Sequence, residues 1–142
     1  MLKQFLIGFV LATMAAGVTS MGNAAETGFA PQTSNDRGVK VAVTPQNLLK
    51  EAKTWDFEVT LETHTQALSE DLVKSSTLIS DGKQYAPLGW EGAPPGGHHR
   101  KGSLRFKTIT PQPPLVELQI RLTGEAAPRS FKWFLKGASN GN

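Results

Sequence analysis

Three histidines are the residues of this sequence with the clearest capacity for chemistry. The chain contains His64, His98 and His99 and no other histidine, and a neutral imidazole binds zinc, copper and nickel well. Glu62 lies two residues before His64, so both side chains share one face of an extended strand. Glu91 lies near the start of the segment that carries the other two, and either carboxylate could orient an imidazole or act as a ligand. The pattern predicts a small site for a divalent transition ion, copper or zinc first.

The segment from Trp90 to Gly102 reads WEGAPPGGHHRKG. Its prolines fix φ and lack an amide donor, whereas its central glycines allow positive φ. Such a turn could let the imidazoles of His98 and His99 converge, although adjacent residues of a regular strand face opposite ways. The spacing matches no tight metal motif such as H-E-x-x-H. Whether His64 approaches this segment therefore depends on the fold.

Two other interpretations of the same residues stay open. In a structural one, one histidine of the pair packs under the loop and hydrogen-bonds a carbonyl, while the other is exposed. Arg100 then ties the loop to an acidic neighbour such as Glu91, and Trp90 is its apolar anchor. In the second, the loop docks a protein or glycan partner through Trp90 and Arg100.

Catalysis has little support in the sequence. An activated nucleophile needs a base beside it and a third group that orients the base, and neither a G-x-S-x-G element nor a cysteine is present. The adjacent carboxylates of Glu70 and Asp71 are more typical of a solvated loop than of acid–base work. The lack of cysteine also excludes blue-copper, iron–sulfur and thiolate-zinc sites. We expect a non-enzymatic protein.

Residues 1–25 are predicted to be a secretory signal peptide. A short positive start is followed by an uncharged apolar run over residues 5–18 and a small, mostly polar stretch. The run is shorter than the roughly 20 residues that span a bilayer, so we expect no transmembrane segment in the mature chain. Cleavage is placed after Ser20, Ala24 or Ala25. The protein is then expected in the periplasm or outside the cell.

The charge of the mature chain is nearly balanced. Loss of Lys3 leaves 14 lysines and arginines against 12 aspartates and glutamates. Because nucleic-acid partners require a concentrated basic surface, none is predicted. If Asp56, Glu58 and Glu62 lie on strands beside outward basic residues such as Arg105, these charges are expected to pair across the sheet.

Most of the remaining chain alternates apolar and polar residues with a period of two, which is typical of half-buried strands. About seven strands with turn signals between them predict an all-β fold, an antiparallel immunoglobulin-like β-sandwich. A small barrel is the alternative. Trp55 and Trp133 occupy positions of this alternation that are expected to face the core. The expected strands fall at 39–43, 55–61, 73–80, 83–88, 104–107, 116–122 and 131–135, with Asp81-Gly82 as a hairpin turn and a short helix from Thr44 to Ala52.

The predicted organisation is a flexible leader over residues 26–37, the sandwich domain over 38–136 and a disordered tail over 137–142. Several blocks are distinctive as they stand here: Trp55-x-Phe57-x-Val59-x-Leu61-x-Thr63-His64, Tyr85-x-Pro87-Leu88-x-Trp90-Glu91-Gly92, PPGGHHR at 94–100, and Gly102-x-Leu104-x-Phe106. With these blocks the chain resembles a group of small exported bacterial immunoglobulin-like β-sandwich domains of unknown function. The resemblance implies the fold and places His64 in one pattern with His98 and His99. It implies no substrate.

Overall fold

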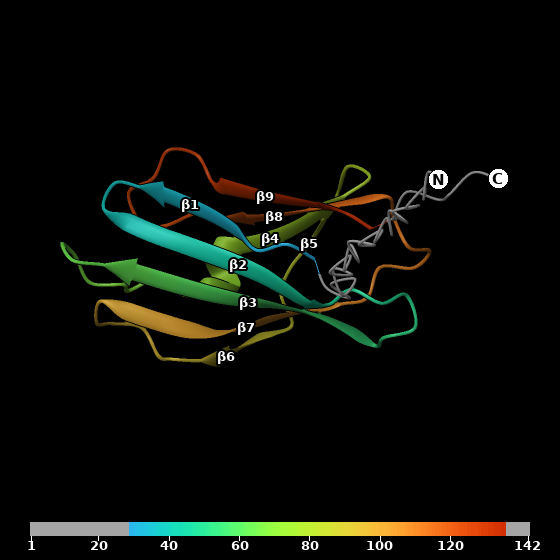
Figure 1. The fold of residues 1–142 in the computed structure, drawn as a ribbon, viewed down its shortest axis with the longest axis horizontal. Coiled ribbons are helices and arrows are strands. Elements are labelled where there is room, and N and C mark those ends of the chain that lie inside the picture. Colours follow the sequence, from blue (N-terminus) through green and yellow to red (C-terminus); the bar gives the residue numbers. More distant parts are fainter. Residues whose placement is uncertain (1–28, 136–142) are drawn as a thin grey trace, which may run out of the picture.

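The computed structural model describes residues 29–135, which form nine strands (Figure 1), and in most of them apolar side chains occupy every second position. One helical turn, α1 (Leu72–Ser75), interrupts them, with Asp71 as its N-cap. The strands are β1 (Gln32–Asp36), β2 (Val39–Asn47), β3 (Thr54–Thr63), β4 (Ser76–Ser80), β5 (Lys83–Tyr85), β6 (Gly89–Gly92), β7 (His99–Lys107), β8 (Leu115–Ile120) and β9 (Arg129–Phe134).

The strands form two antiparallel sheets that lie one above the other (Figure 1). The five-stranded sheet has the order β1-β2-β3-β7-β6, and the four-stranded sheet has the order β5-β4-β8-β9. Chain segments cross from one sheet to the other between β3 and β4, between β5 and β6, and between β7 and β8. The all-β class and the two antiparallel sheets are as the sequence predicts.

The core lies between the sheets and is rich in aromatic rings. Phe57 of β3 packs edge-on against Phe106 of β7, with ring centroids 5.7 Å apart. It also reaches Trp133 of β9 in the other sheet, at 5.6 Å. Trp55 and Trp133 are both buried, which confirms their predicted core parity. The sandwich is therefore closed by large side chains on opposite sheets.

The helix expected from Thr44 to Ala52 is wrong. The β2 strand continues to Asn47 and contains Pro45. Proline is tolerated there because β1 pairs only with residues 39–43, which leaves this part of β2 at the sheet edge. A shift in register between Pro45 and Asn47 marks a bulge.

The leader predicted over residues 26–37 needs correction as well, because β1 pairs with β2 from Gln32 to Asp36. The turn between them has positive φ at Arg37 (49°) and Gly38 (75°), which suits a two-residue hairpin. The side chain of Gln32 also donates to the carbonyl of Lys132 in β9 and accepts from its amide. The backbone pairing of β1 with β2 and the bonds of Gln32 need no apolar side chains in β1, so a search for alternating apolar residues does not find this strand.

The turn at Asp81-Gly82 joins β4 and β5 as expected, with φ of 49° and 75°. The signal peptide and the tail fall on residues outside those described. Within residues 29–135, no helix has the length and apolar character needed to cross a membrane.

Candidate histidine site at the ends of β3 and β7

The three histidines come to the same end of the five-stranded sheet. In the ladder between β3 and β7, Glu62 lies opposite His99. One residue further, the amide of Thr63 donates to the carbonyl of His98 at 2.9 Å. His64 directly follows Thr63, so it leaves β3 beside the histidine pair. We call this region the histidine end: the last residues of β3, the first of β7, and the connecting segments 64–71 and 93–98.

The carboxylate of Glu62 lies next to one of the imidazoles. Its Oε1 lies 3.5 Å from Nδ1 of His99, and both side chains are largely exposed. A carboxylate beside Nδ1 favours the tautomer with the proton there, and Nε2 is then the nitrogen available to a ligand. His64 and His98 are exposed too. All three imidazoles are thus open to solvent.

The side chains do not gather into a metal-binding cluster in this structure. Over the described range, residues 29–135, no three His, Asp or Glu side chains are grouped so that they could hold an ion. Glu91 does not approach the histidines, since it lies opposite Ser103 and forms a 3.5 Å ion pair with Arg105. The fold brings the histidines to one end, but the imidazoles point to no shared position.

The backbone beneath these side chains is held in place. The amide of Gly96 donates to the carbonyl of Leu68 at 2.7 Å, and the amide of Leu68 donates to Gly97 at 2.9 Å. Gly96 and Gly97 have φ of 115° and 71°, a region that favours glycine. These two bonds pair the loop between β6 and β7 with the segment that follows His64. The PPGGHH segment is therefore a fixed loop with exposed side chains.

Arg100 is not the exposed partner contact that the docking interpretation requires. Its side chain is only 1% exposed, because strand alternation turns it inward between His99 and Lys101. Its guanidinium donates to the carbonyls of Glu70 at 2.8 Å, Leu68 at 3.3 Å and Ala93 at 3.3 Å. Burial lowers the pKa of Arg100, against the opposing effect of the acids at 70 and 71. This residue holds the connecting segments of the histidine end from inside.

Trp90 is half-buried and acts as the anchor of the loop. Its indole Nε1 donates to the carbonyl of Ala93 at 3.0 Å, and the guanidinium of Arg100 lies 5.7 Å from the ring centroid. The ring covers the place where Gly92 and Gly102 face each other, and a Cβ on Gly102 would lie 2.5 Å from Trp90 Cζ2. Trp90 therefore anchors the loop and Arg100 ties it to the fold, as the structural interpretation expects. The partners of Arg100 are backbone carbonyls, however, and not the carboxylate of Glu91.

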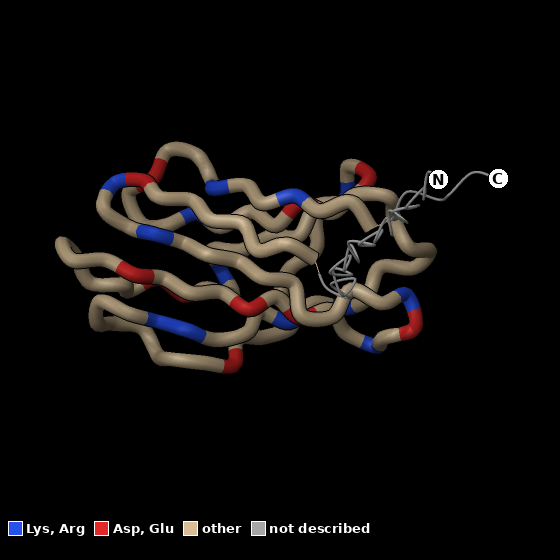
Figure 2. The backbone as a smooth tube through the Cα atoms, in the orientation of Figure 1, with Lys and Arg blue, Asp and Glu red and all other residues tan. Residues whose placement is uncertain are grey.

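Charges on the outer face of the five-stranded sheet pair across β3 and β7, as predicted. Figure 2 shows acidic positions along β3 beside basic positions on β7. Asp56 accepts from Arg105 at 2.9 Å, and Glu58 lies 3.5 Å from Lys101. The hydrogen bond to Asp56 is the main reason that the pKa of Arg105 is raised. This face presents balanced charge.

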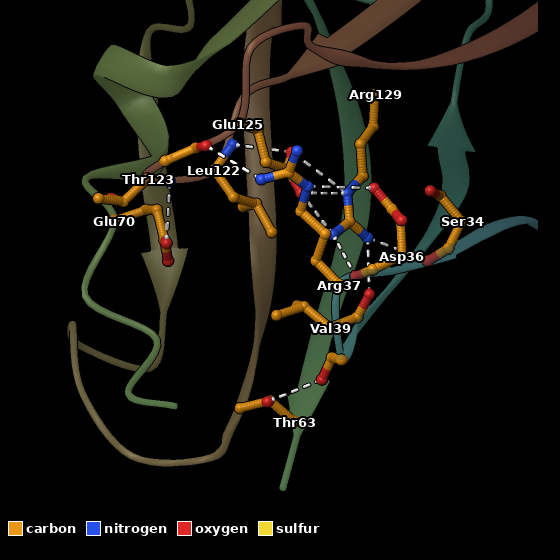
Figure 3. Close-up of polar contacts among 12 residues, drawn as sticks. Ser34, Asp36, Arg37, Val39, Thr63, Glu70, Leu122, Thr123, Glu125 and Arg129 are labelled. Atoms are coloured by element: carbon orange, nitrogen blue, oxygen red, sulfur yellow. Dashed lines mark hydrogen bonds and ion pairs between the residues drawn. The ribbon is translucent and has the colours of Figure 1, made fainter. Parts of the chain in front are cut away.

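A buried ion pair that the sequence pattern does not predict lies at the same end of the fold. Arg129 donates to Glu125 and also to carbonyls of the β1–β2 hairpin, at Val39 (2.7 Å), Asp36 (2.9 Å) and Ser34 (3.3 Å) (Figure 3). The sequence does indicate this burial, because Arg129 lies two residues before Phe131 and four before Trp133 and therefore faces the same side of the strand. An arginine at a core position requires a buried partner.

No family model, curated protein or solved structure matches the chain in the comparisons made. The function is therefore inferred from the site itself: three exposed imidazoles and a carboxylate on a backbone fixed by hydrogen bonds.

Proposed function

We propose that the protein is an exported, non-enzymatic module of immunoglobulin-like type that binds a divalent transition-metal ion, copper or zinc, at its histidine end. The ligands in this proposal are His64, His98 and His99, and Glu62 orients His99. Export rests on the predicted signal peptide in residues 1–25.

The strand orders support the immunoglobulin-like part of the proposal. Without β1, the five-stranded sheet reads β2-β3-β7-β6, which corresponds to strands A-B-E-D of the immunoglobulin fold. The other sheet, β5-β4-β8-β9, then corresponds to C′-C-F-G. In this correspondence, β1 is an additional edge strand before strand A. The histidines lie where strand B ends and strand E begins.

The observation that carries the metal proposal is the hydrogen bond from the Thr63 amide to the His98 carbonyl, 2.9 Å long. It joins the two strand ends that hold every imidazole of the chain. His64 precedes His98 by 34 residues in the sequence, so only this pairing of β3 with β7 brings it near the histidine pair. Imidazole is the commonest protein ligand for zinc and copper.

The proposal requires the imidazoles to rotate toward a shared ion. Exposed side chains change rotamer in picoseconds to nanoseconds, and the three histidines are exposed. The fixed backbone limits the entropy lost on binding, because only side chains have to be ordered. Glu62 lies 3.5 Å from the ring of His99 and could hold it in place once the ion is bound.

A second candidate is docking of a protein or glycan beside Trp90. A hollow of about 280 Å³ is lined by this residue together with Leu88, Glu91, Ser103 and Arg105, and Leu88 is 60% exposed. This candidate depends on the exposed apolar side chain of Leu88 next to the half-buried ring of Trp90. Arg100 has no part in this candidate, because it is buried.

Calorimetric titration of the mature protein, without a histidine tag, separates the two candidates. The metal proposal predicts about one copper or zinc ion per chain, and loss of binding at acidic pH as imidazoles take up protons. His64→Ala, His98→Ala and His99→Ala should each weaken binding while circular dichroism shows an intact fold. The matched control is Glu58→Gln, which removes a carboxylate from the same face away from the histidines.

Equal metal binding by the wild type and the triple His→Ala variant would contradict the metal proposal. The docking candidate predicts no metal effect on melting temperature. It also predicts that Leu88→Ser weakens partner binding while the triple His→Ala variant retains it.

A further inference from the structure

Thr63, the last residue of β3, lies directly before the first histidine and has its side chain turned inward. It is only 4% exposed, whereas Glu62 and His64 on either side of it are exposed. This follows from the alternation of side chains along a strand. Because a buried hydroxyl needs hydrogen-bond partners, the partners of Thr63 Oγ1 show which parts of the chain it holds.

The hydroxyl of Thr63 closes a turn around His64. Its Oγ1 accepts the amide of Thr65 at 3.2 Å, a bond between the residue before the histidine and the residue after it. Threonine side chains form such turns with the amide two residues further on. The same hydroxyl donates to the carbonyl of Gly38 at 2.8 Å. The backbone that carries His64 is thereby tied to the β1–β2 turn.

The β1–β2 turn is itself fixed, so it is a firm anchor for His64. Gly38 has φ of 75°, and the carbonyl of the next residue, Val39, accepts from the buried Arg129 at 2.7 Å. The turn and the segment after β3 also touch, because a Cβ on Gly38 would lie 2.9 Å from Oγ1 of Thr65. The position of His64 thus depends on residues near the start of the described chain.

The main chain of Thr63 holds the second histidine segment. Its amide donates to the carbonyl of His98 at 2.9 Å. One residue therefore contacts both segments, through its hydroxyl on the His64 side and through its amide on the His98 side. Loss of the hydroxyl alone separates these roles, because it frees the backbone at His64 and leaves the pairing of β3 with β7 in place.

We propose that Thr63 is a positioning residue of the histidine end: its hydroxyl fixes the backbone from which His64 reaches an ion shared with His98 and His99. The inference rests on the proposed metal binding, and Thr63 itself contacts no ion. Without the hydroxyl, the backbone of residues 64 and 65 has more conformations to lose on binding, and fixing the backbone of a residue is costly in entropy. His64 is then the ligand that is lost.

Thr63→Val tests this role in the mature protein without a histidine tag, because valine has the same shape and keeps the amide. Zinc affinity, measured by calorimetry, should fall at least about tenfold, since the backbone of residues 64 and 65 must be ordered on binding. In the imidazole proton spectrum, zinc should shift the rings of His98 and His99 but no longer that of His64. In the zinc-free variant, the amide of Thr65 should exchange faster than in the wild type.

Two variants serve as controls. Thr63→Ser keeps the hydroxyl and should bind zinc within about threefold of the wild type. Thr77→Val makes the same exchange in β4 of the other sheet, opposite Gln119, and should leave the affinity within about twofold.

The outcomes separate this role from the proposed function. Wild-type affinity in Thr63→Val, with shifts of all three rings, overturns the role of Thr63 and leaves the metal binding standing. An equal loss of affinity in the valine and serine variants, or in Thr63→Val and Thr77→Val, overturns it too. Absence of zinc binding by the wild type contradicts the proposed function and, with it, this inference.

Discussion

Nη2 of Arg129 lies 2.6 Å from Oε1 of Glu125, and the two side chains are only 5% and 7% exposed. The pair joins the β8–β9 loop to the β1–β2 hairpin through three carbonyls that Arg129 also binds. Glu125→Ala leaves the arginine charged and buried without its partner, which costs about 3–5 kcal/mol of unfolding free energy. Denaturant unfolding measures this difference.

The matched control for that variant is Glu62→Gln, which removes an exposed partner and should cost less than about 1 kcal/mol. A cost for Glu125→Ala as small as that of the control would contradict the buried pair.

Arg100→Met tests whether this arginine is an internal clamp. The variant keeps much of the aliphatic volume but leaves the carbonyl of Glu70 without its donor, and it removes one of the two donors to the carbonyls of Leu68 and Ala93. Since an unsatisfied buried polar group costs about 1–3 kcal/mol, we expect a loss of at least about 2 kcal/mol in unfolding free energy. Amide exchange should become faster at residues 93–98. Wild-type stability together with slow exchange in this loop would show that Arg100 is not structural.

Gly102→Ala tests the close approach of β6 and β7 beneath Trp90. The added Cβ would lie 2.5 Å from both the Glu91 carbonyl oxygen and Trp90 Cζ2, so the ring and a backbone strand must move. Such overpacking costs about 1–3 kcal/mol, which chemical denaturation can resolve. Gly89→Ala in β6 is the control, because no atom lies within 4 Å of its added Cβ. Equal stability of the two variants would disprove the close contact.

We expect Glu117 to make a small contribution to stability that is lost at acidic pH. Its carboxylate accepts from Ser130 at 2.6 Å and from Gln119 at 2.9 Å, and these bonds, that of Ser130 above all, lower its pKa below the ordinary value of 4.5. A pKa lower in the folded than in the unfolded state stabilises the fold above the unfolded value, and the benefit is lost as the pH falls through the folded value. Because solvent still reaches this half-buried carboxylate and screens it, the contribution is below about 1 kcal/mol.

Urea unfolding of the wild type and Glu117→Gln checks this contribution. The wild type should be the more stable at pH 7, and the two curves should converge once the pH has fallen below the lowered pKa of Glu117. Ser130→Ala should reproduce much of the loss at pH 7, because it removes the main hydrogen bond. A stability gap that stays constant with pH would contradict this explanation.

Strands with alternating side chains could be predicted from the sequence, since a buried face requires an apolar residue at every second position. This rule located Trp55 and Trp133 in the core. It failed at β1, whose pairing uses backbone groups and the side chain of Gln32. It also failed at Pro45, because whether a proline lies at a sheet edge depends on which strands pair.

The sequence predicts which residue types form the candidate site, but not how they are arranged in space. The position of His64 beside His98 depends on the register of β3 and β7, which is a long-range property. The inward direction of Arg100 follows from its place between His99 and Lys101. Its partners are backbone carbonyls, which every residue has, so the sequence does not identify them. The sequence also allows Glu91 as a partner of the histidines, whereas its strand register places it opposite Ser103, where its carboxylate pairs with Arg105.

The central claim is that His64, His98 and His99 bind one ion together, and the imidazole proton resonances of the mature, tag-free protein test it most directly. These three are its only histidines, so the spectrum resolves each ring. On titration with zinc, we predict that all three rings shift and that the changes are complete at about one equivalent. Shifts confined to one ring, or no saturation at one equivalent, would contradict the claim.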